Sequence, residues 1–345
     1  MLEIDGSMGE GGGQVLRTSL TLSVLTGKAI RVIRMRAKRS KPGLREQHRI
    51  AVQAAASVSG ARVEGARLGS KRLTFHPEGL RSGDYRFRME TAGSCSLVLQ
   101  TIFLPLSVIA EPSRVEIQGG THVPWSPSFH FLQMHWLPLM QRCGYRGDLE
   151  LDQAGFYPRG GGCMRARIQA GVPGPGMNLT SSGPLLRVRG VSAVSNLPLT
   201  IAQRQRDQAL RRLEHLDCPL EIHVQQAPAM GKGTFLLLQA ECEQSQGCFT
   251  ALGELGKPAE RVADEAVEQM LAFLSSGAGT DKYLADQLLL PLALAREPSS
   301  FTTSCVTQHL LTNAAVIEAF GVASITVRGD VEDPGSVQIK PRERP

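Results

Sequence analysis

The pattern of apolar and polar positions repeats three times along the chain. In each repeat, an apolar helical stretch leads to a turn, a strand-like run, a polar loop, a second helical stretch and a closing glycine. The segments that follow this order are 15–60, 94–144 and 283–321. A shared order of elements at this length predicts three copies of one mixed helix-and-strand unit.

Two leucine-rich stretches carry the clearest trace of the repeat. They are LPLSVIAEPS at 104–113 and LPLALAREPS at 290–299. Both contain an internal proline and both end in Glu-Pro-Ser, which predicts two helices that stop at equivalent points. The first segment differs, because TLSVLTGKAI at 21–30 has Gly27 in place of Glu-Pro, and glycine ends a helix equally well.

Spacing locates extra sequence between the second and third copies. The closing glycines Gly60 and Gly144 lie 84 residues apart, whereas Gly144 and Gly321 lie 177 apart, so about 93 residues are additional. Stretches rich in Gly, Pro and Ser at 171–184 and 275–281 bound them, as linkers would. Strand-like and helix-like runs between these boundaries predict a compact α/β unit.

We therefore predict an α+β fold with a large domain of three repeats, residues 1–178 and 280–340, and a small inserted α/β domain, residues 180–278. Units of about 84 residues are too long for a solenoid. A closed threefold arrangement would bring equivalent loops to one end, so we expect a site built from residues that are distant in sequence.

Composition narrows the class of protein. The 345 residues are 42% hydrophobic, which suits a packed globular chain, and the net charge of +6 permits a polyanionic partner without requiring one. Seven cysteines without any C-x-x-C pair fit neither a disulfide framework nor a structural zinc site. The acidic start, and the lack of roughly 20 uninterrupted apolar residues, predict a cytoplasmic protein with no signal peptide and no membrane partner.

The glycine run GEGGGQVLR at 9–17 enters a predicted helix. Glycines let a backbone approach a ligand closely, and the amides at a helix N-terminus favour an anion, although a tight turn would need the same residues. The run matches neither the P-loop nor the dinucleotide motif. Glu10 would repel a phosphate there unless a divalent metal lay between them.

The segment RVIRMRAKRSKPGLREQHR at 31–49 is strongly basic. It contains eight Lys and Arg residues and the single acid Glu46. Arg predominates, which favours forked contacts to phosphate oxygens. A solvated basic surface is the alternative interpretation.

Further candidates are less specific when taken singly. Gln100 is a late polar residue on a leucine-rich helix and could be a core amide, while GGTHVPWSPSFHF at 119–131 predicts a rigid loop suited to stacking on a base. Asp286 lies with Tyr283 and Gln287 at a predicted helix start, where an acid also stabilises the helix dipole. His309 falls in the polar loop ahead of the last helix, as a candidate nucleophile or an ordinary loop histidine.

Six blocks together resemble the RNA 3'-terminal phosphate cyclases over nearly the whole large domain. The blocks, in order, are DGSMGEGGGQVLR, RSKPGLREQH, ETAGSCSLVLQ, GFYPRGGG, YLADQLLLPLALA and HLLTN. The resemblance implies three βαβαββ-like units similar to the enolpyruvyl transferases, with an inserted small α/β domain. In the insert, the resemblance rests mainly on position and length.

The resemblance implies a ligase-type reaction with ATP as cosubstrate and a divalent metal, Mg or Mn. A histidine matching His309 attacks the α-phosphate of ATP, releases pyrophosphate and holds AMP. AMP then passes to the RNA 3'-phosphate, and the neighbouring 2'-hydroxyl displaces it to give a 2',3'-cyclic phosphate. RNA 3'-phosphate ends are the implied partner, and no obligate protein partner is predicted.

The resemblance also implies roles for individual residues, beginning with His309 as nucleophile and Glu10 as metal ligand. The positions implied to contact phosphate or the RNA end are Arg17, Arg36, Arg39, Gln47 and His48. The positions implied to line the adenylate site are Gln100, Pro127, Phe249, Tyr283, Leu284, Ala285, Asp286 and Gln287. Lys38 departs from the small residue expected in the basic block, which puts the local loop geometry in doubt.

Two other readings use the same fold. A non-catalytic cyclase-like protein that binds RNA and assists ribosome assembly would lack the histidine block, so His309 within HLLTN argues against it. An enolpyruvyl transferase would need basic residues that bind carboxylates across two comparable lobes, and it has no use for RSKPGLREQH.

Overall fold

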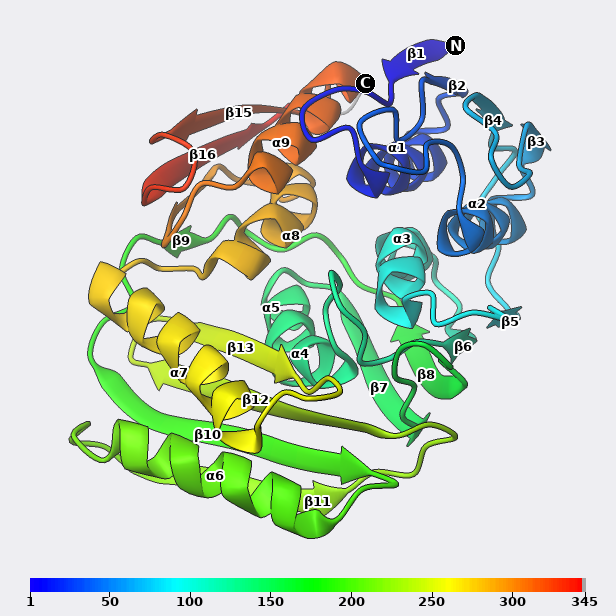
Figure 1. Cartoon of the computed structure of the whole chain (residues 1–345). Coiled ribbons are helices and arrows are strands. Elements are labelled where there is room, and N and C mark those ends of the chain that lie inside the picture. The colour runs from blue at the N-terminus through cyan, green and yellow to red at the C-terminus, as the bar shows by residue number, and fades with distance from the viewer. Residues whose placement is uncertain (343–345) are drawn as a thin grey trace.

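A computed structural model describes residues 1–342 of the chain. Within this range the strands form four four-stranded sheets, and helices pack between three of the sheets (Figure 1). One large cluster of buried apolar side chains runs through these three sheets and their helices, and a second, smaller cluster lies under the fourth sheet. The α+β class predicted from the sequence is confirmed.

The first sheet has the strand order β1-β2-β4-β3. β1 and β2 are parallel, and β4 pairs antiparallel with both β2 and β3. Its elements are β1 (Leu2–Asp5), α1 (Gly13–Thr26), β2 (Ile30–Ile33), α2 (Glu46–Ser59), β3 (Arg62–Glu64) and β4 (Leu73–His76). Gly27 follows α1 with a φ of 69°, a left-handed conformation that glycine adopts without strain, so the predicted end of this helix is confirmed.

The second sheet has the equivalent order β5-β6-β8-β7, with one parallel and two antiparallel pairings. Its elements are β5 (Asp84–Arg88), α3 (Cys95–Ser107), β6 (Ser113–Gly119), α4 (Phe129–Phe131), the π-helical turn η1 (Leu132–Trp136), α5 (Leu137–Arg142), β7 (Arg146–Gln153) and β8 (Gly162–Gln169).

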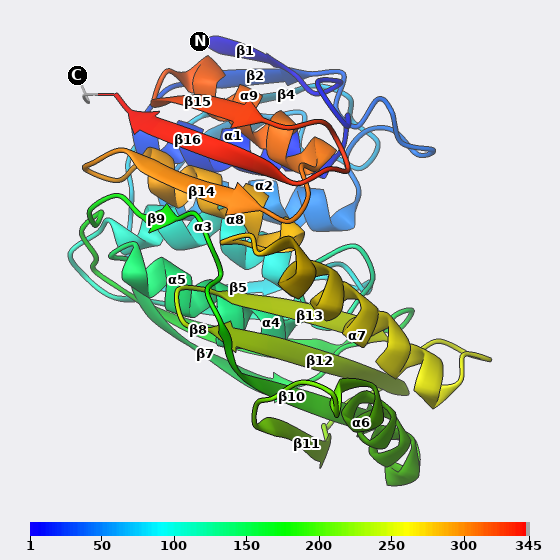
Figure 2. The same cartoon turned by 90° about the vertical axis from the view of Figure 1, so that its left-hand side faces the viewer.

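The third sheet combines β9 with strands from the C-terminal part of the chain, in the order β9-β14-β16-β15 (Figure 2). Its elements are β9 (Asn178–Leu179), α8 (Lys282–Ala293), β14 (Ser299–Thr303), α9 (Gln308–Phe320), β15 (Ala323–Arg328) and β16 (Gly335–Pro341). Its pairings again comprise one parallel and two antiparallel ladders. Both leucine-rich stretches form helices that retain their internal prolines, Pro105 in α3 and Pro291 in α8, as predicted.

The fourth sheet lies between β9 and α8 in sequence and has the order β11-β10-β12-β13. Its elements are β10 (Leu185–Ser195), α6 (Leu199–Leu213), β11 (Leu220–Gln226), β12 (Gly233–Cys242), β13 (Gln246–Leu252) and α7 (Ala259–Ser276). Both helices pack against the sheet and against each other (Figure 1). The strand-like and helix-like runs predicted in this part of the sequence are therefore confirmed. No helix in residues 1–342 is long and apolar enough to cross a membrane.

Two buried histidines connect the 119–131 segment to the fourth sheet. His122 Nε2 lies 2.8 Å from His130 Nδ1, and the His122 ring stacks on Phe235 of β12 at a centroid distance of 4.4 Å. Burial lowers the pKa of His130 to about 4 and that of His122 well below its ordinary value. Both rings are therefore neutral and act as core side chains, so the segment predicted to stack on a base uses most of its aromatic residues in packing.

We expect the free energy of unfolding to fall as the pH drops below about 6.5, the value at which these histidines titrate in the unfolded chain. In the folded state His130 resists protonation until about pH 4 and His122 resists it too, so at these two residues only the unfolded chain gains protons in this window. His130 contributes a loss of up to about 3 kcal/mol at the acidic end. Chemical denaturation at several pH values across this range measures the slope of the free energy of unfolding against pH. Replacing both His122 and His130 with Phe should flatten it, whereas replacing the exposed His223 with Asn should not. An unchanged slope in the double variant would show that His122 and His130 are not the source of the pH dependence.

Candidate functional site

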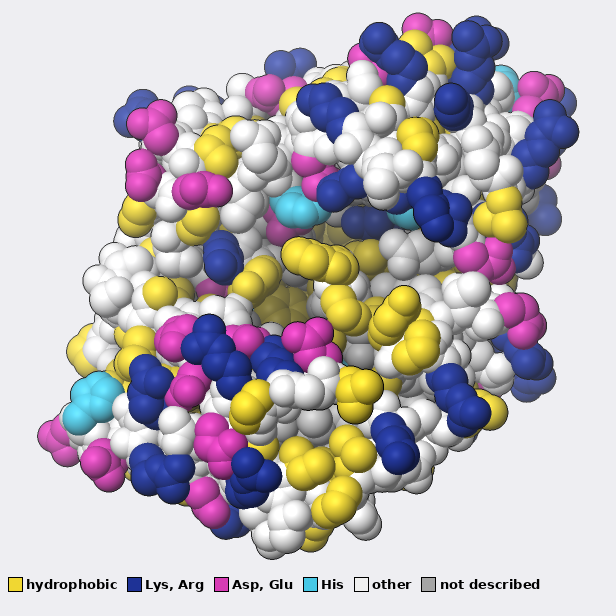
Figure 3. Space-filling model, in the orientation of Figure 1, with side chains coloured by type: hydrophobic (Ala, Val, Ile, Leu, Met, Phe, Trp, Pro, Cys, Tyr) yellow, Lys and Arg dark blue, Asp and Glu magenta, His cyan; other side chains and the backbone are white. Residues whose placement is uncertain are grey.

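A cavity of about 1190 Å³ opens where α1, α3, α8 and β13 approach one another. Figure 3 shows a hollow on this face, with basic and histidine side chains along its upper edge and hydrophobic side chains on its floor. Seven of the residues predicted to bind ATP or phosphate, or to act in catalysis, line the cavity. They are Arg17, Gln100, Pro127, Tyr283, Asp286, Gln287 and His309.

Residues distant in sequence meet in this cavity. Gln100 Nε2 donates to Gln287 Oε1 over 2.5 Å, although 187 positions separate the two residues. Asn313 connects the helices beneath them: its Nδ2 donates to the Asp286 carbonyl over 2.6 Å, and its Oδ1 accepts from the Thr18 hydroxyl over 2.6 Å. The chain thus fixes α1, α8 and α9 relative to one another with buried hydrogen bonds.

His309 lies in the first turn of α9, whose N-terminus is capped by the Thr307 side chain. The prediction that His309 precedes the helix is wrong, because the Thr307 hydroxyl accepts from the Leu310 amide and starts the helix earlier. His309 Nδ1 lies 3.2 Å from Glu10 Oε1. The Glu10 carboxylate, acting as acceptor for His309, raises the pKa of His309, although burial opposes the change. With Nδ1 facing a carboxylate, the neutral ring presents a lone pair on Nε2.

Glu10 is almost buried between Arg39 and His309. Its side chain is 10% exposed, and its Oε2 accepts from Arg39 Nη2 over 2.5 Å while its Oε1 faces His309. Burial alone would raise the pKa of this carboxyl, but His309, Arg39 and Arg17 together hold it below its ordinary value. Glu10 therefore stays ionised and can fix the orientation of the His309 ring.

Gly12 and Gly13 allow these side chains to converge. A Cβ atom at Gly13 would lie 2.4 Å from His48 Nε2 and 2.8 Å from Arg17 Nη1, and one at Gly12 would lie 2.5 Å from Glu10 Oε1. Any larger residue would push these functional groups apart. The glycine run thus makes room for the protein's own charged groups around the start of α1.

Arg17 and Asp286 bring opposite charges into the buried part of the cavity wall. Burial lowers the pKa of Arg17 to about 10, with Glu10 and Asp286 opposing the change, so the guanidinium stays charged at neutral pH. Burial raises the pKa of Asp286 to about 6, an effect that His309 and Arg17 partly offset. Asp286 lies in the second turn of α8, so it is not the acid that caps this helix.

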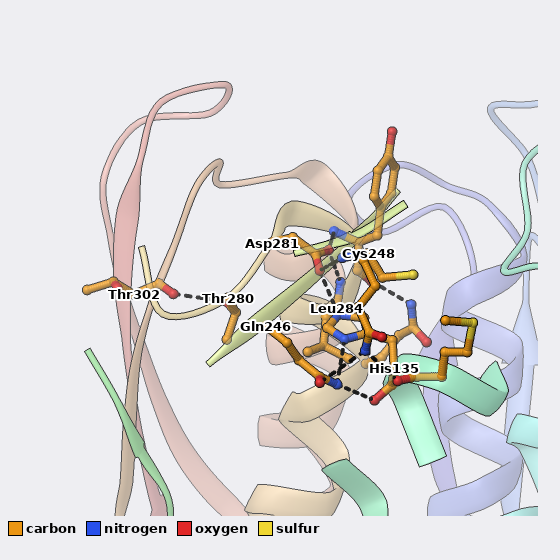
Figure 4. Close-up of polar contacts among 11 residues, drawn as sticks. His135, Gln246, Cys248, Thr280, Asp281, Leu284 and Thr302 are labelled. Atoms are coloured by element: carbon orange, nitrogen blue, oxygen red, sulfur yellow. Dashed lines mark hydrogen bonds and ion pairs between the residues drawn. The ribbon is translucent and has the colours of Figure 1, made fainter. Parts of the chain in front are cut away.

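Asp281 caps α8 and joins it to two other parts of the structure (Figure 4). The donors to its carboxylate are His135 Nε2 at 2.7 Å and the backbone amides of Tyr283 at 2.8 Å, Leu284 at 3.0 Å and Cys248 at 3.3 Å. Gln246 Nε2 donates to His135 Nδ1 over 3.0 Å, so His135 carries its proton on Nε2. Since both members of the His135–Asp281 pair are fully buried, this cluster holds the start of α8 firmly beside β13 and η1.

The other predicted phosphate contacts surround the cavity without lining it. Arg36 Nη1 donates to the carbonyls of Lys41 and Gly43, so Arg36 shapes its own loop. Gln47 Oε1 accepts from the Ser94 amide over 3.2 Å. His48 is buried, and burial together with the nearby arginines lowers its pKa far below the ordinary value, so the ring is neutral.

Lys38, the residue that departs from the family pattern, has a structural partner. Its Nζ donates to the Gly9 carbonyl over 2.6 Å, which ties the basic loop to the glycine run. Within the same loop, Arg34 pairs with Asp5. The basic segment is thus partly an internal ion-pair network and partly a source of cations for the cavity rim.

Three residues predicted to line the adenylate site have buried side chains outside the cavity lining. Phe249 packs in the core of the fourth sheet, with its ring centroid 5.7 Å from that of Phe273. Leu284 and Ala285 belong to the large core cluster. Their roles in the site stay predictions that rest on the resemblance. Sequence reasoning missed Lys257, which lines the cavity from the weakly patterned insert and offered no motif.

A divalent metal beside His309 would find the Glu10 carboxylate, which lies against this ring. Residues 1–342 contain no group of three or more His, Cys, Asp or Glu side chains arranged to hold a metal ion. Glu10 therefore fits a magnesium or manganese ion that takes most of its oxygen ligands from phosphate and water, and does not fit an ion held in a protein cage.

Comparison with known proteins assigns the chain to a family. The family model described as RNA 3'-terminal phosphate cyclase matches residues 8–327. A relative from Pseudomonas fluorescens with that name is 47% identical over 95% of this chain and 94% of its own length, and one from Ectopseudomonas mendocina is 44% identical over 92% of each chain. The chain therefore belongs to the RNA 3'-terminal phosphate cyclase family.

Among solved structures, the enolpyruvyl transferase NikO from Streptomyces tendae matches 50% of this chain and 33% of its own. Its sequence identity is 15% and its TM-score is 0.28. A score this low carries no argument about the fold.

Proposed function

We propose that this protein uses ATP to convert an RNA 3'-terminal phosphate into a 2',3'-cyclic phosphate through a covalent histidine–AMP intermediate. The observation that carries the proposal is the contact between His309 and Glu10 at a cavity lined by Arg17, in a chain of the cyclase family. This arrangement supplies a nucleophile, a group that orients it and a buried positive charge for phosphate.

In the first step, His309 Nε2 attacks the α-phosphorus of ATP. A P–N bond forms as the bond to the pyrophosphate oxygen breaks, and pyrophosphate leaves. The Nδ1 proton stays directed at Glu10, which stabilises the positive ring that develops. Arg17, which lines the cavity, offsets the negative charge on the phosphates. A magnesium or manganese ion held by Glu10 would add further charge neutralisation when bound.

In the later steps, the terminal phosphate of the RNA attacks the adenylate phosphorus and the P–N bond breaks, which frees His309. The 3'-phosphate is now an anhydride with AMP as its leaving group. The adjacent 2'-hydroxyl attacks the terminal phosphorus, AMP departs, and the ring closes. Because that hydroxyl is already held beside the phosphorus, closure is effectively unimolecular.

The remaining cavity residues suit a nucleotide. Pro127 and the partly exposed Tyr283 offer apolar surface to the base, and Gln100 and Gln287 offer polar groups. We assign Phe249, Leu284 and Ala285 to the packing that supports this surface. Arg36, Gln47 and His48 are assigned to the side of the site that receives the RNA end.

Incubation with α-labelled ATP tests the proposal. The protein should retain label after denaturation, and RNA carrying a 3'-phosphate should discharge it. A non-catalytic RNA-binding relative would retain none, and an enolpyruvyl transferase would not discharge label to RNA.

An RNA end that lacks the 2'-hydroxyl should stall. With a terminal 2'-deoxyribose 3'-phosphate, we expect AMP transfer to the RNA followed by accumulation of the adenylylated end, because the attacking oxygen of the last step is missing. Gel analysis of labelled RNA measures this species, and the matched ribose end is the control. Release of AMP from the deoxy end at the normal rate would exclude attack by the 2'-hydroxyl.

We further propose that residues 1–178 and 280–340 are three copies of one βαβαββ-like unit and that residues 180–278 are an insertion into the third. The first three sheets have equivalent strand orders, and the fourth sheet has its own apolar cluster, which supports this division. A cytoplasmic location and the lack of an obligate protein partner remain part of the proposal.

A further inference from the structure

Three loops from different parts of the sequence lie side by side next to the cavity. An isolated β-bridge pairs His122 with Phe156, and another pairs Ala154 with Ala229. The bridges align the segments 121–125, 154–159 and 227–232. We call the surface of these three loops the outer strip. It includes part of the GFYPRGGG block, which the proposed reaction does not use.

Each loop of the outer strip exposes one large apolar side chain. Trp125 is 99% exposed, Tyr157 is 71% exposed and Met230 is 64% exposed. Side chains of this size are usually at least partly covered in a folded protein, and three on adjoining loops form a patch that packing does not explain. Trp125 also lines the cavity, so the outer strip begins at the cavity mouth.

The far end of the outer strip is basic. A hollow of about 450 Å³ is lined by Arg159, Asn196, Met230, Gly231 and Lys232, a set without any carboxylate. Arg159 Nη1 donates to the Met230 carbonyl over 3.1 Å, which joins two of the loops. Within residues 1–342, neither Arg159 nor Lys232 forms an ion pair, and both are exposed, so both positive charges are available to a partner.

Close packing connects the outer strip to the basic side of the site. A Cβ atom at Gly160 would lie 2.9 Å from Ala92 Cα, and one at Gly93 would lie 3.1 Å from Gln47 Cβ. The outer strip therefore adjoins the turn before α3, which in turn contacts α2 at Gln47. A strand whose end lies near His309 has a continuous protein surface along which to leave the cavity.

We propose that the outer strip binds the nucleotides that precede the reacting 3' end, as a single strand. This inference rests on the proposed function. Exposed aromatic rings that stack on bases, together with unpaired cations that contact phosphates, are the chemistry by which proteins hold single-stranded nucleic acid without reading its sequence. A protein partner would be met better by apolar surface that is not interrupted by unpaired charge.

Substrate length separates this inference from the reaction itself. The probes are a dinucleotide and a longer single-stranded RNA that share the same terminal residues and 3'-phosphate. Tyr157→Ala should lower kcat/KM for the longer RNA by roughly fivefold to a hundredfold, the usual effect of losing one stacked base. Tyr157→Phe should restore it, because the ring remains. Protein adenylation and cyclisation of the dinucleotide should not change.

The cations are tested by salt dependence. The double variant Arg159→Ala with Lys232→Ala should reduce the slope of log affinity against log salt for the longer RNA by up to about two. Arg146→Ala is the matched control, since Arg146 lies at the opposite end of β7 from the outer strip and is also exposed. In the Arg146→Ala protein, the slope of log affinity against log salt should fall less than in the double variant.

Fluorescence reports on the cavity end of the outer strip. The sequence has two tryptophans, of which Trp125 is exposed and Trp136 is buried. The longer RNA should quench the emission of the native protein, and Trp125→Phe should remove that response.

Equal losses of kcat/KM with short and long RNA in the Tyr157→Ala protein, or no loss with either, would overturn the inference. If instead neither RNA is cyclised by the native protein, the proposed function fails and not the outer strip alone.

Discussion

His309→Ala protein is expected to retain no AMP after incubation with α-labelled ATP, and to form no cyclic RNA ends. In the proposed reaction, the His309 imidazole forms the covalent bond between protein and AMP. No other side chain is proposed to take its place. Removal of a covalent nucleophile costs roughly a millionfold in other enzymes, which places the residual rate below detection. Label on the denatured protein that survives base but is released by acid, as expected for a P–N bond, is the measurement.

The fold should survive this change, because the His309 side chain is half exposed and lies in a helix whose cap is Thr307. A thermal melt that matches the native protein separates loss of chemistry from loss of structure. His223→Ala removes an exposed histidine from the fourth sheet and should leave labelling intact. His309→Ala protein that still accepts AMP would remove His309 from the mechanism.

Arg39→Ala is expected to slow the RNA-dependent step far more than the formation of enzyme-bound AMP. ATP alone suffices for the first step, whereas a terminal phosphate brought beside His309 needs its own cation. The loss of such a partly buried charged contact costs about 2–5 kcal/mol, or roughly 30-fold or more in the affected step. Arg39→Lys should restore only part, because an ammonium lacks the planar fork. Single-turnover assays that time the two steps separately measure the difference.

Arg36 should act through Arg39. Its guanidinium holds the carbonyls of Lys41 and Gly43, so Arg36→Ala should displace the loop that carries Arg39. The effects of the two substitutions should therefore not add in the double variant. Arg31→Ala, in β2, removes an exposed arginine from the same basic segment as a control. Small and equal effects of all these changes on both steps would make this segment an ordinary solvated surface.

Local sequence signals predicted the elements well. Gly27, the internal prolines Pro105 and Pro291, and the periodic apolar runs each act through nearby backbone geometry, which a sequence displays directly. The start of α9 was misplaced because a short run of polar residues conceals the Thr307 cap. Caps depend on the backbone angle of one residue, so helix boundaries are harder to predict than helices.

Pairings across the chain could not be predicted from local signals. The contact between Glu10 and His309, and the position of Arg39 against Glu10, depend on how α1, α9 and the basic loop pack together. The sequence showed that these residues are of types that bind phosphate or act in catalysis. Only the family resemblance indicated that they belong to one site. The side-chain burial of Phe249 follows from the alternation of β13, which the weak pattern of the insert did not reveal.

The Asp281 cluster has a consequence for how this chain can change over evolutionary time. The fully buried Asp281 carboxylate accepts hydrogen bonds from η1, from β13 and from its own helix. Since β13 belongs to the fourth sheet, this sheet supplies one of the donors that satisfy the buried carboxylate. Deleting the fourth sheet would expose that carboxylate and release the first turn of α8, which carries Tyr283 towards the cavity. Because the fourth sheet now supports the start of α8, a mutation that deletes this sheet would harm the protein. The fourth sheet is therefore required even if it makes no contact with the substrate.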